Sequence, residues 1–322
     1  MNKFIKHNHH HDGIDRRGFL ECMAWAGTGV LWTLSGGILS SRVLGQVTEI
    51  EKTGLPSGSF HFAQISDSHI GFNKAANPDV AGTFRETIAR LNALADAPEF
   101  ILHTGDLTHL AEAAEFDTLE QLLHDCRTKK VFYVPGEHDI LNDNGAQYRE
   151  RFGKGTLGTG WHSFDYKGVH FIGLVNVADI SEGGLGILGE AQLNWLARDV
   201  ASLSSETPIV VYAHIPLWSV YPKWGWGTND ADLALAMLKR FGSVTVLNGH
   251  IHQALQKVEG NVTFHTARST AFPQPAPGSA PKPGPMLVDA PRLKSTLGLT
   301  RVTYVEAISP LAIVDSTLAD PL

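Results

Sequence analysis

Two histidines separated by one residue, His250 and His252, follow a short apolar run at 244–247 that predicts a buried strand. Both imidazoles reach one small centre only if the backbone between them is extended or sharply bent. Imidazole nitrogen is a good ligand for zinc, iron, nickel and manganese ions. Because one such pair is weak evidence for a metal site, its weight depends on what accompanies it.

Four other predicted strand ends carry side chains of the same kind. In chain order they are Asp67-Ser68-His69, Gly105-Asp106, Gly136-Glu137-His138-Asp139 and His214. Mixed carboxylate and imidazole ligands suit paired borderline cations such as Fe, Mn, Zn or Co. Two such ions about 3.5–4 Å apart hold the attacking and leaving oxygens of an in-line displacement and lower the pKa of bound water. The pattern therefore favours a two-metal hydrolytic site.

The elements that must position these groups alternate between apolar strands and amphipathic helices. Strands are expected at 60–66, 100–104, 131–134, 162–166, 169–175, 208–213, 244–247, 262–267 and 302–308, and helices at 79–95, 112–126, 190–203 and 230–241. This order predicts a layered α/β fold with its site at the carboxyl ends of the strands. The proline-rich segment 272–291 is expected to be a long irregular loop, not a second domain.

The composition is that of a soluble globular chain of 322 residues, 43% hydrophobic and 18% charged. A net charge of −7 gives no support for a nucleic-acid partner. Sixteen histidines are many for this length and are a first indication of metal binding. If the N-terminal segment is removed, as argued next, Cys22 is lost and Cys126 remains as one thiol without an internal disulfide.

The N-terminal segment resembles a twin-arginine export signal. Arg16 and Arg17 precede Phe19-Leu20, then a moderately apolar stretch at 23–39 and small residues up to Gly45. The resemblance implies a signal peptide at 1–45, a mature domain at 46–322, the export machinery as a partner, and a bacterial, periplasmic or otherwise exported protein. An uncleaved anchor helix is the alternative, but glycine, threonine and serine dilute a run of about the minimum spanning length, so no stable membrane span is expected.

The five motifs in this order resemble the calcineurin-like metallophosphoesterases, from residue 60 to about 267. The neighbourhoods of Asp106 and Gly136 look most like the bacterial cyclic-nucleotide and glycerophosphodiester phosphodiesterase branch. The resemblance implies a four-layer αββα sandwich of two mixed sheets flanked by helices. It also implies two divalent or trivalent ions and hydrolysis of phosphate mono- or diesters by a metal-bridging hydroxide.

The resemblance assigns a role to each motif residue. Asp67, His69 and His252 would hold the first ion, Asp106 would bridge both ions, and His214 and His250 would hold the second. His138 matches the catalytic histidine, which stabilises the transition state or protonates the leaving oxygen. The histidines at 7, 9, 10 and 11 precede the paired arginines and are excluded from the site.

Glu137 departs from the family pattern, which usually places asparagine there. A glutamate adds negative charge beside the second ion, weakens its Lewis acidity and removes an amide donor for the phosphate. We expect Glu137 to ligate this ion; otherwise it turns to solvent and leaves the second site weak. An alternative function is a metal-binding scaffold or interaction protein with reduced or lost catalysis.

Several other residues are open to two interpretations. His109 either approaches the first ion or the substrate or lies at a loop edge, and Asp139 either orients His138 or is a solvated carboxylate. His61, His103, His170 and His265 are expected to be structural or to lie behind the ligands. Trp218, Tyr221, Trp224 and Trp226 form either a pocket wall or oligomer contact or simple loop packing. The Asn261 glycosylation sequon is discounted, and the sequence does not determine the oligomeric state, the native metals or the ester.

Overall fold

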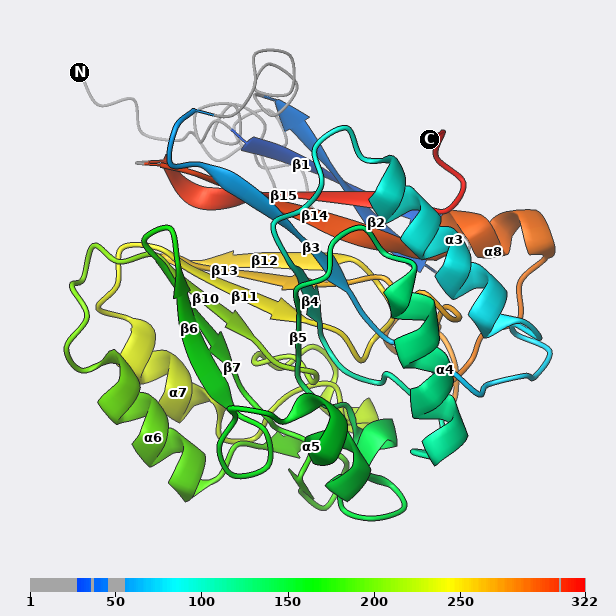
Figure 1. The fold of residues 1–322 in the computed structure, drawn as a ribbon, viewed down its shortest axis with the longest axis horizontal. Coiled ribbons are helices and arrows are strands. Elements are labelled where there is room, and N and C mark those ends of the chain that lie inside the picture. Colours follow the sequence, from blue (N-terminus) through cyan, green and yellow to red (C-terminus); the bar gives the residue numbers. More distant parts are fainter. Residues whose placement is uncertain (1–27, 36–37, 46–55, 307, 322) are drawn as a thin grey trace, which may run out of the picture.

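Two β-sheets pack face to face between outer layers of helices in the computed structural model, which describes residues 28–35, 38–45, 56–306 and 308–321. Figure 1 shows helices α3 (Val80–Ala93) and α4 (Ala113–His124) on one side of the sandwich. Helices α6 (Glu190–Val200) and α7 (Ala231–Leu238) lie on the other side. The predicted four-layer αββα sandwich is confirmed.

One sheet has the strand order β15-β14-β3-β4-β5. Strands β3 (Phe60–Ile65), β4 (Ile101–His103) and β5 (Val131–Tyr133) run parallel, and β14 (Gly298–Val305) and β15 (Ile308–Thr317) complete the sheet as an antiparallel hairpin. Because the three parallel strands end at the same edge, the loops that follow them leave the sheet side by side.

The other sheet has the order β12-β13-β11-β10-β7-β6. Four central strands are parallel, and the two edge strands are antiparallel to their neighbours. The bounds are β6 His162–Tyr166, β7 Val169–Gly173, β10 Ile209–Tyr212, β11 Val244–Asn248, β12 Leu255–Glu259 and β13 Val262–Thr266. All residues of β7, β10, β11 and β13 are buried, as expected for strands covered on both faces.

The helices follow from their sequence patterns. In α3 the buried residues Val80, Phe84, Ile88 and Leu91 recur every three or four positions, so one stripe faces the sheet. Asp79 caps this helix, since its Oδ1 accepts a hydrogen bond from the Gly82 amide at 2.8 Å. Shorter helices are α5 (Ala146–Phe152), α8 (Ala290–Thr296) and the 3₁₀ turns η1 (Glu137–Ile140) and η2 (Pro222–Trp224), while β8 (Asp179–Ile180) pairs with β9 (Gly186–Ile187).

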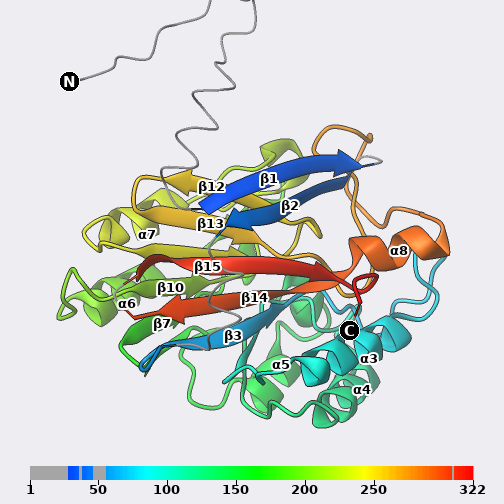
Figure 2. The same cartoon turned by 90° about the horizontal axis from the view of Figure 1, so that it is seen from above.

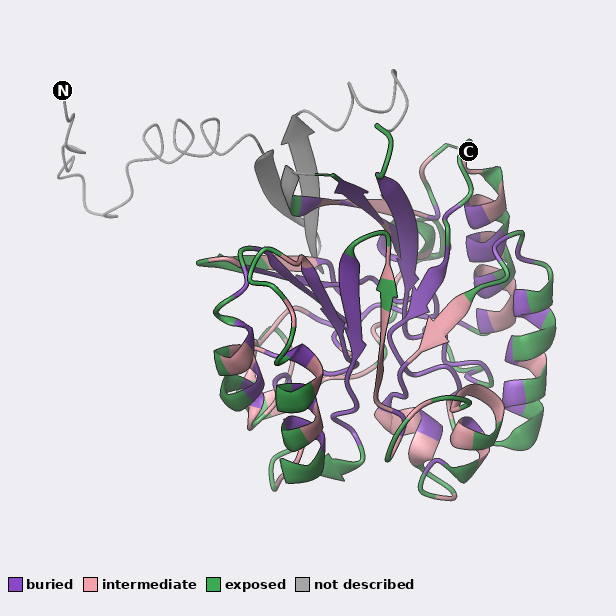
Figure 3. Cartoon of the chain, turned by 60° about the vertical axis from the view of Figure 1, so that its left-hand side comes forward, coloured by how far each residue is buried: buried purple, intermediate pink, exposed green. Residues whose placement is uncertain are grey.

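An aromatic core fills the space between the sheets, where Figure 3 shows the strands as buried. Phe62 stacks on Phe100 with ring centroids 5.1 Å apart, and both rings meet Phe171 of the opposite sheet edge-on, at 5.4 and 5.2 Å. The Gln64 side chain of β3 donates to the Asn248 carbonyl oxygen of β11 at 3.1 Å. This buried bond links the two sheets close to their carboxyl ends.

Some predicted elements differ from the structure. The strand expected at 302–308 is wrong, because β14 ends at Val305 and a reversal places Ile308 in β15. The loop at 272–291 is irregular as predicted except at its end, where α8 begins at Ala290. The sequence interpretation also missed α5 and β12, which are short elements at the surface.

Strands β1 (Thr28–Ser35) and β2 (Ile38–Gly45) form an antiparallel pair, and β2 lies beside β12 and β15 (Figure 2). The paired arginines and the start of the apolar stretch fall outside the described residues, so the signal peptide, its boundary at 45 and the mature domain at 46–322 stay predictions. Within the part of the chain that the structure describes, no helix combines the length and apolarity that a membrane crossing requires.

Candidate metal centre

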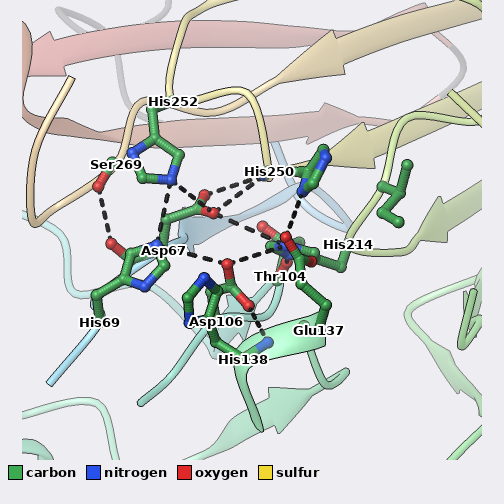
Figure 4. Close-up of polar contacts among 12 residues, drawn as sticks. Asp67, His69, Thr104, Asp106, Glu137, His138, His214, His250, His252 and Ser269 are labelled. Carbon is green, nitrogen blue, oxygen red and sulfur yellow. Dashed lines mark hydrogen bonds and ion pairs between the residues drawn. The ribbon is translucent and has the colours of Figure 1, made fainter. Parts of the chain in front are cut away.

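The side chains predicted from five motifs converge at the carboxyl ends of the strands, as Figure 4 shows. Each motif leaves a different strand: β3 precedes Asp67 and His69, β4 precedes Asp106, β5 precedes Glu137 and His138, β10 precedes His214, and β11 precedes His250 and His252. Their side chains form overlapping groups whose nitrogen and oxygen atoms lie within 4.8 Å of one another. The convergence that the spacing predicted is therefore present.

One group consists of Asp67, His69 and His252, all buried. The Nε2 atoms of His69 and His252 lie 3.2 Å apart, and His252 Nε2 lies 3.3 Å from Asp67 Oδ1. Two imidazole nitrogens and a carboxylate oxygen this close together have the composition of a transition-metal site.

A second group consists of Glu137, His214 and His250. Glu137 Oε2 lies 2.9 Å from His214 Nε2, and Glu137 Oε1 lies 3.0 Å from His250 Nδ1. The glutamate therefore points into the site and not to solvent. Whether it ligates an ion remains a prediction, but its carboxylate has the required position.

Asp106 lies between the two groups. Its Oδ2 is 3.4 Å from His69 Nε2 in the first group and 3.3 Å from His214 Nε2 in the second. Its Oδ1 accepts a hydrogen bond from the His138 amide at 3.0 Å, which fixes the carboxylate. One oxygen within reach of both groups has the position predicted for a bridging ligand.

Backbone carbonyls place a proton on Nδ1 of two rings. His214 Nδ1 lies 2.7 Å from the Thr104 oxygen, and His252 Nδ1 lies 2.5 Å from the Phe272 oxygen. Since a carbonyl oxygen only accepts, Nδ1 must carry the proton in each ring. Nε2 of His214 and His252 is therefore the nitrogen that faces the carboxylates of the site, and it would be the ligand atom once a metal ion displaces any proton it carries.

Apart from their ion-pair contacts within the second group, three buried polar atoms have no hydrogen-bond partner: Glu137 Oε2, His214 Nε2 and His250 Nδ1. Leaving buried polar groups unsatisfied costs roughly 1–3 kcal/mol each, more for charged groups. A bound cation would satisfy all three at once. The residues present therefore fit a metal ion in the second group, and the donor set fits a second ion in the first.

The charges of the apo site act strongly on one another. Burial opposes ionisation of Asp67, but His252 and His214 outweigh it and lower the pKa of Asp67 to about 2. The pKa of Glu137 is likewise held well below its usual range, because His250 and His214 outweigh burial. These carboxylates are ionised at neutral pH and are ready to bind a cation.

Left-handed backbone is concentrated at the site. Of the eight described non-glycine residues with positive φ, five are predicted metal ligands: Asp67, His69, Asp106, His250 and His252. Such conformations cost of order 1–3 kcal/mol each and persist where the surroundings determine them. Positive φ at His250 and His252 bends the backbone sharply, as is needed for both side chains to reach the same site.

Two motif glycines are explained by close packing. A Cβ on Gly105, whose φ is +95°, would lie 2.5 Å from His214 Nδ1. A Cβ on Gly136 would lie 2.3 Å from the amide nitrogen of Asp106. Side chains here would push apart the loops that carry the ligands, so the glycines allow the loops to approach.

His138 lies beside the first group and is half-buried, unlike the buried Asp67, His69 and His252. Its ring meets the His69 ring edge-on at 4.7 Å, and its Nδ1 donates to the His109 carbonyl oxygen at 2.6 Å. Burial lowers the pKa of His138, but Asp106 and Glu137 outweigh burial and raise it. Its Nε2 is left as the nitrogen that exchanges a proton or contacts a ligand.

Both interpretations of Asp139 were wrong, since it is fully buried and its carboxylate accepts hydrogen bonds from backbone. Oδ2 accepts from the amides of Leu107 and Gly136, at 3.0 and 2.9 Å. Oδ1 accepts from the amide and hydroxyl of Thr108, at 2.8 and 2.9 Å. Asp139 thus ties the Asp106 loop to the Glu137 loop. Burial and Asp106 raise its pKa to about 7, against these donors.

His109 lies near the site, not at a remote loop edge. Its ring stacks on His138 with centroids 4.9 Å apart and meets His69 at 5.6 Å. One nitrogen of each of these three histidines lies within 4.8 Å of the others. His109 is therefore close enough to act on a ligand of the first group.

The sequence interpretation missed the segment at 269–286, which lies against the site. Phe272 stacks on the His69 ring at 4.7 Å, and Gln274 donates to the His250 carbonyl oxygen at 2.9 Å. The Ser269 hydroxyl donates to the Asp67 carbonyl oxygen at 2.8 Å. No motif marks these residues, because their contribution lies in backbone geometry and ring contacts.

The remaining histidines have structural surroundings, as expected. His103 is buried with its Nε2 3.0 Å from the Ser68 hydroxyl, and burial lowers its pKa to about 3. His61 donates from Nε2 to the Asp96 oxygen at 2.8 Å, and His170 and His265 pair with carboxylates.

The aromatic residues after His214 pack mainly on one another and on the domain. Trp226 is buried, and its ring meets Trp224 edge-on at 5.0 Å. Tyr221 meets Trp224 at 5.2 Å, while Trp218 packs on Phe264 at 5.1 Å. Loop packing accounts for these contacts.

Comparison with known proteins gives a consistent result. The model of the calcineurin-like phosphoesterase family matches residues 60–254. A probable cyclic nucleotide phosphodiesterase of Vesicomyosocius okutanii is 25% identical over 219 residues, which cover 66% of this chain and 88% of the relative. The serine/threonine-protein phosphatase CPPED1 of Danio rerio is 26% identical over 224 residues, covering 61% of this chain and 71% of the relative.

Solved structures share the fold. The crystal structure of a dimetal phosphatase from Danio rerio superposes with a TM-score of 0.54 at 14% identity, covering 80% of this chain and 98% of that one. At this identity the similarity shows the arrangement of sheets and helices alone.

Proposed function

Because this chain belongs to the calcineurin-like phosphoesterase family, we propose that it hydrolyses phosphate mono- or diesters at a centre that holds two metal ions. The observation that carries the proposal is the position of Asp106, whose Oδ2 lies within 3.4 Å of a ligand nitrogen in each group. A carboxylate within reach of both groups would hold two ions close together, and closely spaced ions are what two-metal hydrolysis requires.

Each group supplies one ion site in this proposal. Asp67, His69 and His252 would hold the first ion, Glu137, His214 and His250 would hold the second, and Asp106 is within reach of both groups. When bound, the ions supply Lewis acidity and make a water molecule acidic enough to serve as the nucleophile. The donor set suits Fe, Mn, Zn or Co.

The chain's own groups bind the ester and move the proton. His138 is half-buried and its Nδ1 is committed to the His109 oxygen, so Nε2 is the ring nitrogen left to contact the ester. In the protonated form this nitrogen donates to the developing charge or to the leaving oxygen. The Asp106 contact to the His138 amide holds the histidine beside the ion sites.

The test is element analysis combined with a panel of chromogenic phosphate mono- and diesters. The wild-type protein should bind two ions and hydrolyse members of the panel. His138→Ala should keep both ions and lose activity by about 10²–10⁴-fold, the usual contribution of a general acid, whereas His214→Ala should lose an ion as well. Two bound ions with no turnover across the panel would contradict catalysis and favour the scaffold function.

The N-terminal segment supports a proposal about location. We propose that Arg16 and Arg17 direct export by the twin-arginine route and that the protein acts in the periplasm or outside the cell. Replacing both arginines by lysine should retain the protein in the cytoplasm of the bacterial host, measured by fractionation. Export that is unaffected by the double substitution would contradict this.

A further inference from the structure

The Glu137 carboxylate is the third negative charge among the predicted ligands. It bridges two histidines of the second group, with one oxygen 2.9 Å from His214 Nε2 and the other 3.0 Å from His250 Nδ1. Because both oxygens face ligand nitrogens, the charge lies inside the site where an ester must approach the second ion.

We propose, building on the phosphoesterase function above, that Glu137 sets the charge of the site so that monoanionic phosphodiesters are preferred over dianionic monoesters. With neutral histidines, the carboxylates of Asp67, Asp106 and Glu137 leave a pair of divalent ions with one net positive charge. A neutral side chain at 137 would leave two. The second positive charge is worth more to a dianion than to a monoanion, so its absence penalises monoesters selectively.

Among the described residues, no lysine or arginine forms an ion pair with these three carboxylates. The ion pairs that the described residues make with Asp67, Asp106 and Glu137 all come from histidines. His138, which also takes up a proton, is unchanged in every variant compared, so its effect on the two classes of ester is common to all of them. The preference between monoanionic and dianionic esters should therefore depend mainly on the charges of the ions and of the Glu137 carboxylate.

The position of Glu137 is fixed well enough for its charge to act directionally. It begins the 3₁₀ turn η1, whose Asp139 is bound to the loop of Asp106 by backbone hydrogen bonds. The side chain is only 26% exposed. A charge held by the fold and partly screened from water keeps a stronger influence than a mobile surface carboxylate.

The experiment compares two esters with the same leaving group, bis(p-nitrophenyl) phosphate and p-nitrophenyl phosphate, at pH 8 with Mn²⁺ in excess. The variants are Glu137→Gln and Glu137→Asn, which are neutral, and Glu137→Asp, which keeps the charge. Glu206→Gln neutralises an exposed carboxylate before β10, at the strand end opposite His214, and serves as the control. Bound metal is counted in each variant.

The neutral variants should shift the ratio of kcat/KM for diester over monoester about tenfold toward the monoester, the order expected for one charge acting at close range. They should also bind inorganic phosphate about tenfold more tightly, measured by calorimetry without turnover. Glu137→Asp and Glu206→Gln should keep the wild-type ratio and the wild-type phosphate affinity.

Neutral variants that hold two ions and keep the wild-type ratio and phosphate affinity would overturn the inference while leaving the phosphoesterase function intact. A wild-type protein that holds two ions and hydrolyses neither ester would instead refute the function. In that case the phosphate affinities alone decide the effect of the charge: tighter binding by the neutral variants supports it, and equal binding overturns it.

Discussion

The His252 ring donates from Nδ1 to the carbonyl oxygen of Phe272, 2.5 Å away, so an irregular segment holds a predicted metal ligand in place. The Phe272 ring also stacks on His69 and contacts His252 at a tilt, with centroids 4.7 and 4.8 Å away. A segment without regular secondary structure therefore orients the ligands of the first group. Such outer contacts typically change metal affinity or activity 10–100-fold when lost.

Gln274 extends this support to the second group. Its Nε2 donates to the His250 carbonyl oxygen at 2.9 Å, and its Oε1 accepts from the Gly284 amide at 3.0 Å. Gln274→Ala removes both bonds, and we expect about 10-fold weaker binding of the second ion with a smaller loss at the first. Stepwise removal of metal by a chelator, followed by element analysis, measures this.

Gln274→Glu provides the matched comparison for Gln274. It keeps the length of the side chain and the acceptor for Gly284, but it loses the donor to the His250 carbonyl oxygen. If the hydrogen bond donated by Gln274 positions His250, Gln274→Glu should weaken binding of the second ion as much as Gln274→Ala does. Equal retention of both ions by wild type and both variants would show that Gln274 does not position His250.

Asp139 should be more important for stability than an ordinary loop carboxylate. Asp139→Asn keeps the size but turns an amide nitrogen toward donors that now lack an acceptor. With two donors on each oxygen, we expect a loss of about 2–5 kcal/mol in the free energy of unfolding. Because the bonds join two ligand-bearing loops, metal affinity should fall too. Denaturant unfolding with and without excess metal measures both effects.

Asp143 is the control for Asp139. Its carboxylate also accepts backbone hydrogen bonds, from the amides of Ala146 and Gln147, but it is partly exposed. Asp143→Asn should cost no more than about 1 kcal/mol, since water compensates the lost acceptor. Similar losses for the two variants would contradict a special role of Asp139 in joining the loops.

The sequence predicted the layered fold because apolar strands alternate with amphipathic helices, and it predicted the convergence of the ligands because parallel strands end at one edge. Residues such as Asp67 and His214 were identifiable since their types and their places after strands both indicate metal chemistry. The reversal between Val305 and Ile308 was not identifiable, because the intervening Glu306-Ala307 contains no glycine, proline, asparagine or aspartate to mark a hairpin turn.

The outer contacts were not predictable for a different reason. Asp139 follows His138 in the chain, which suggested that it orients its neighbour, whereas three of its four hydrogen bonds come from residues about thirty positions earlier. Phe272 and Gln274 act through a backbone oxygen and a side-chain amide in a proline-rich segment with no periodicity. Contacts of this kind depend on how the loop folds back, and residue types do not encode that locally.

The aromatic core between the sheets gives a prediction about stability alone. Phe100 is fully buried, and its ring contacts six other aromatic rings from both sheets. Phe100→Ala should lower the free energy of unfolding by about 3–5 kcal/mol through lost burial and the cavity left behind. Leu287→Ala, at a side chain that is 69% exposed, should cost little. A loss below about 1 kcal/mol for Phe100→Ala would show that the rings repack.

His170 should make the stability of the protein depend on pH. Its Nδ1 lies 2.8 Å from Asp165 Oδ1 and its Nε2 2.9 Å from Asp199 Oδ2. Burial lowers the pKa of His170, but the two carboxylates outweigh burial and raise it above the usual value of about 6.5. Because the folded state holds the proton more tightly, the stabilisation is fully present below about pH 6.5 and is lost as pH rises through the raised pKa.

His170→Gln should therefore destabilise the protein more at pH 6 than at pH 9, measured as the difference in unfolding free energy from wild type. His170 lies in β7 at the end opposite the metal centre, so metal content should not change. Asp199→Asn removes the less exposed partner and should flatten the same pH dependence, while Glu206→Gln should leave it unaltered. A destabilisation by His170→Gln that is equal at both pH values would mean that the ring contributes by packing and not through its charge.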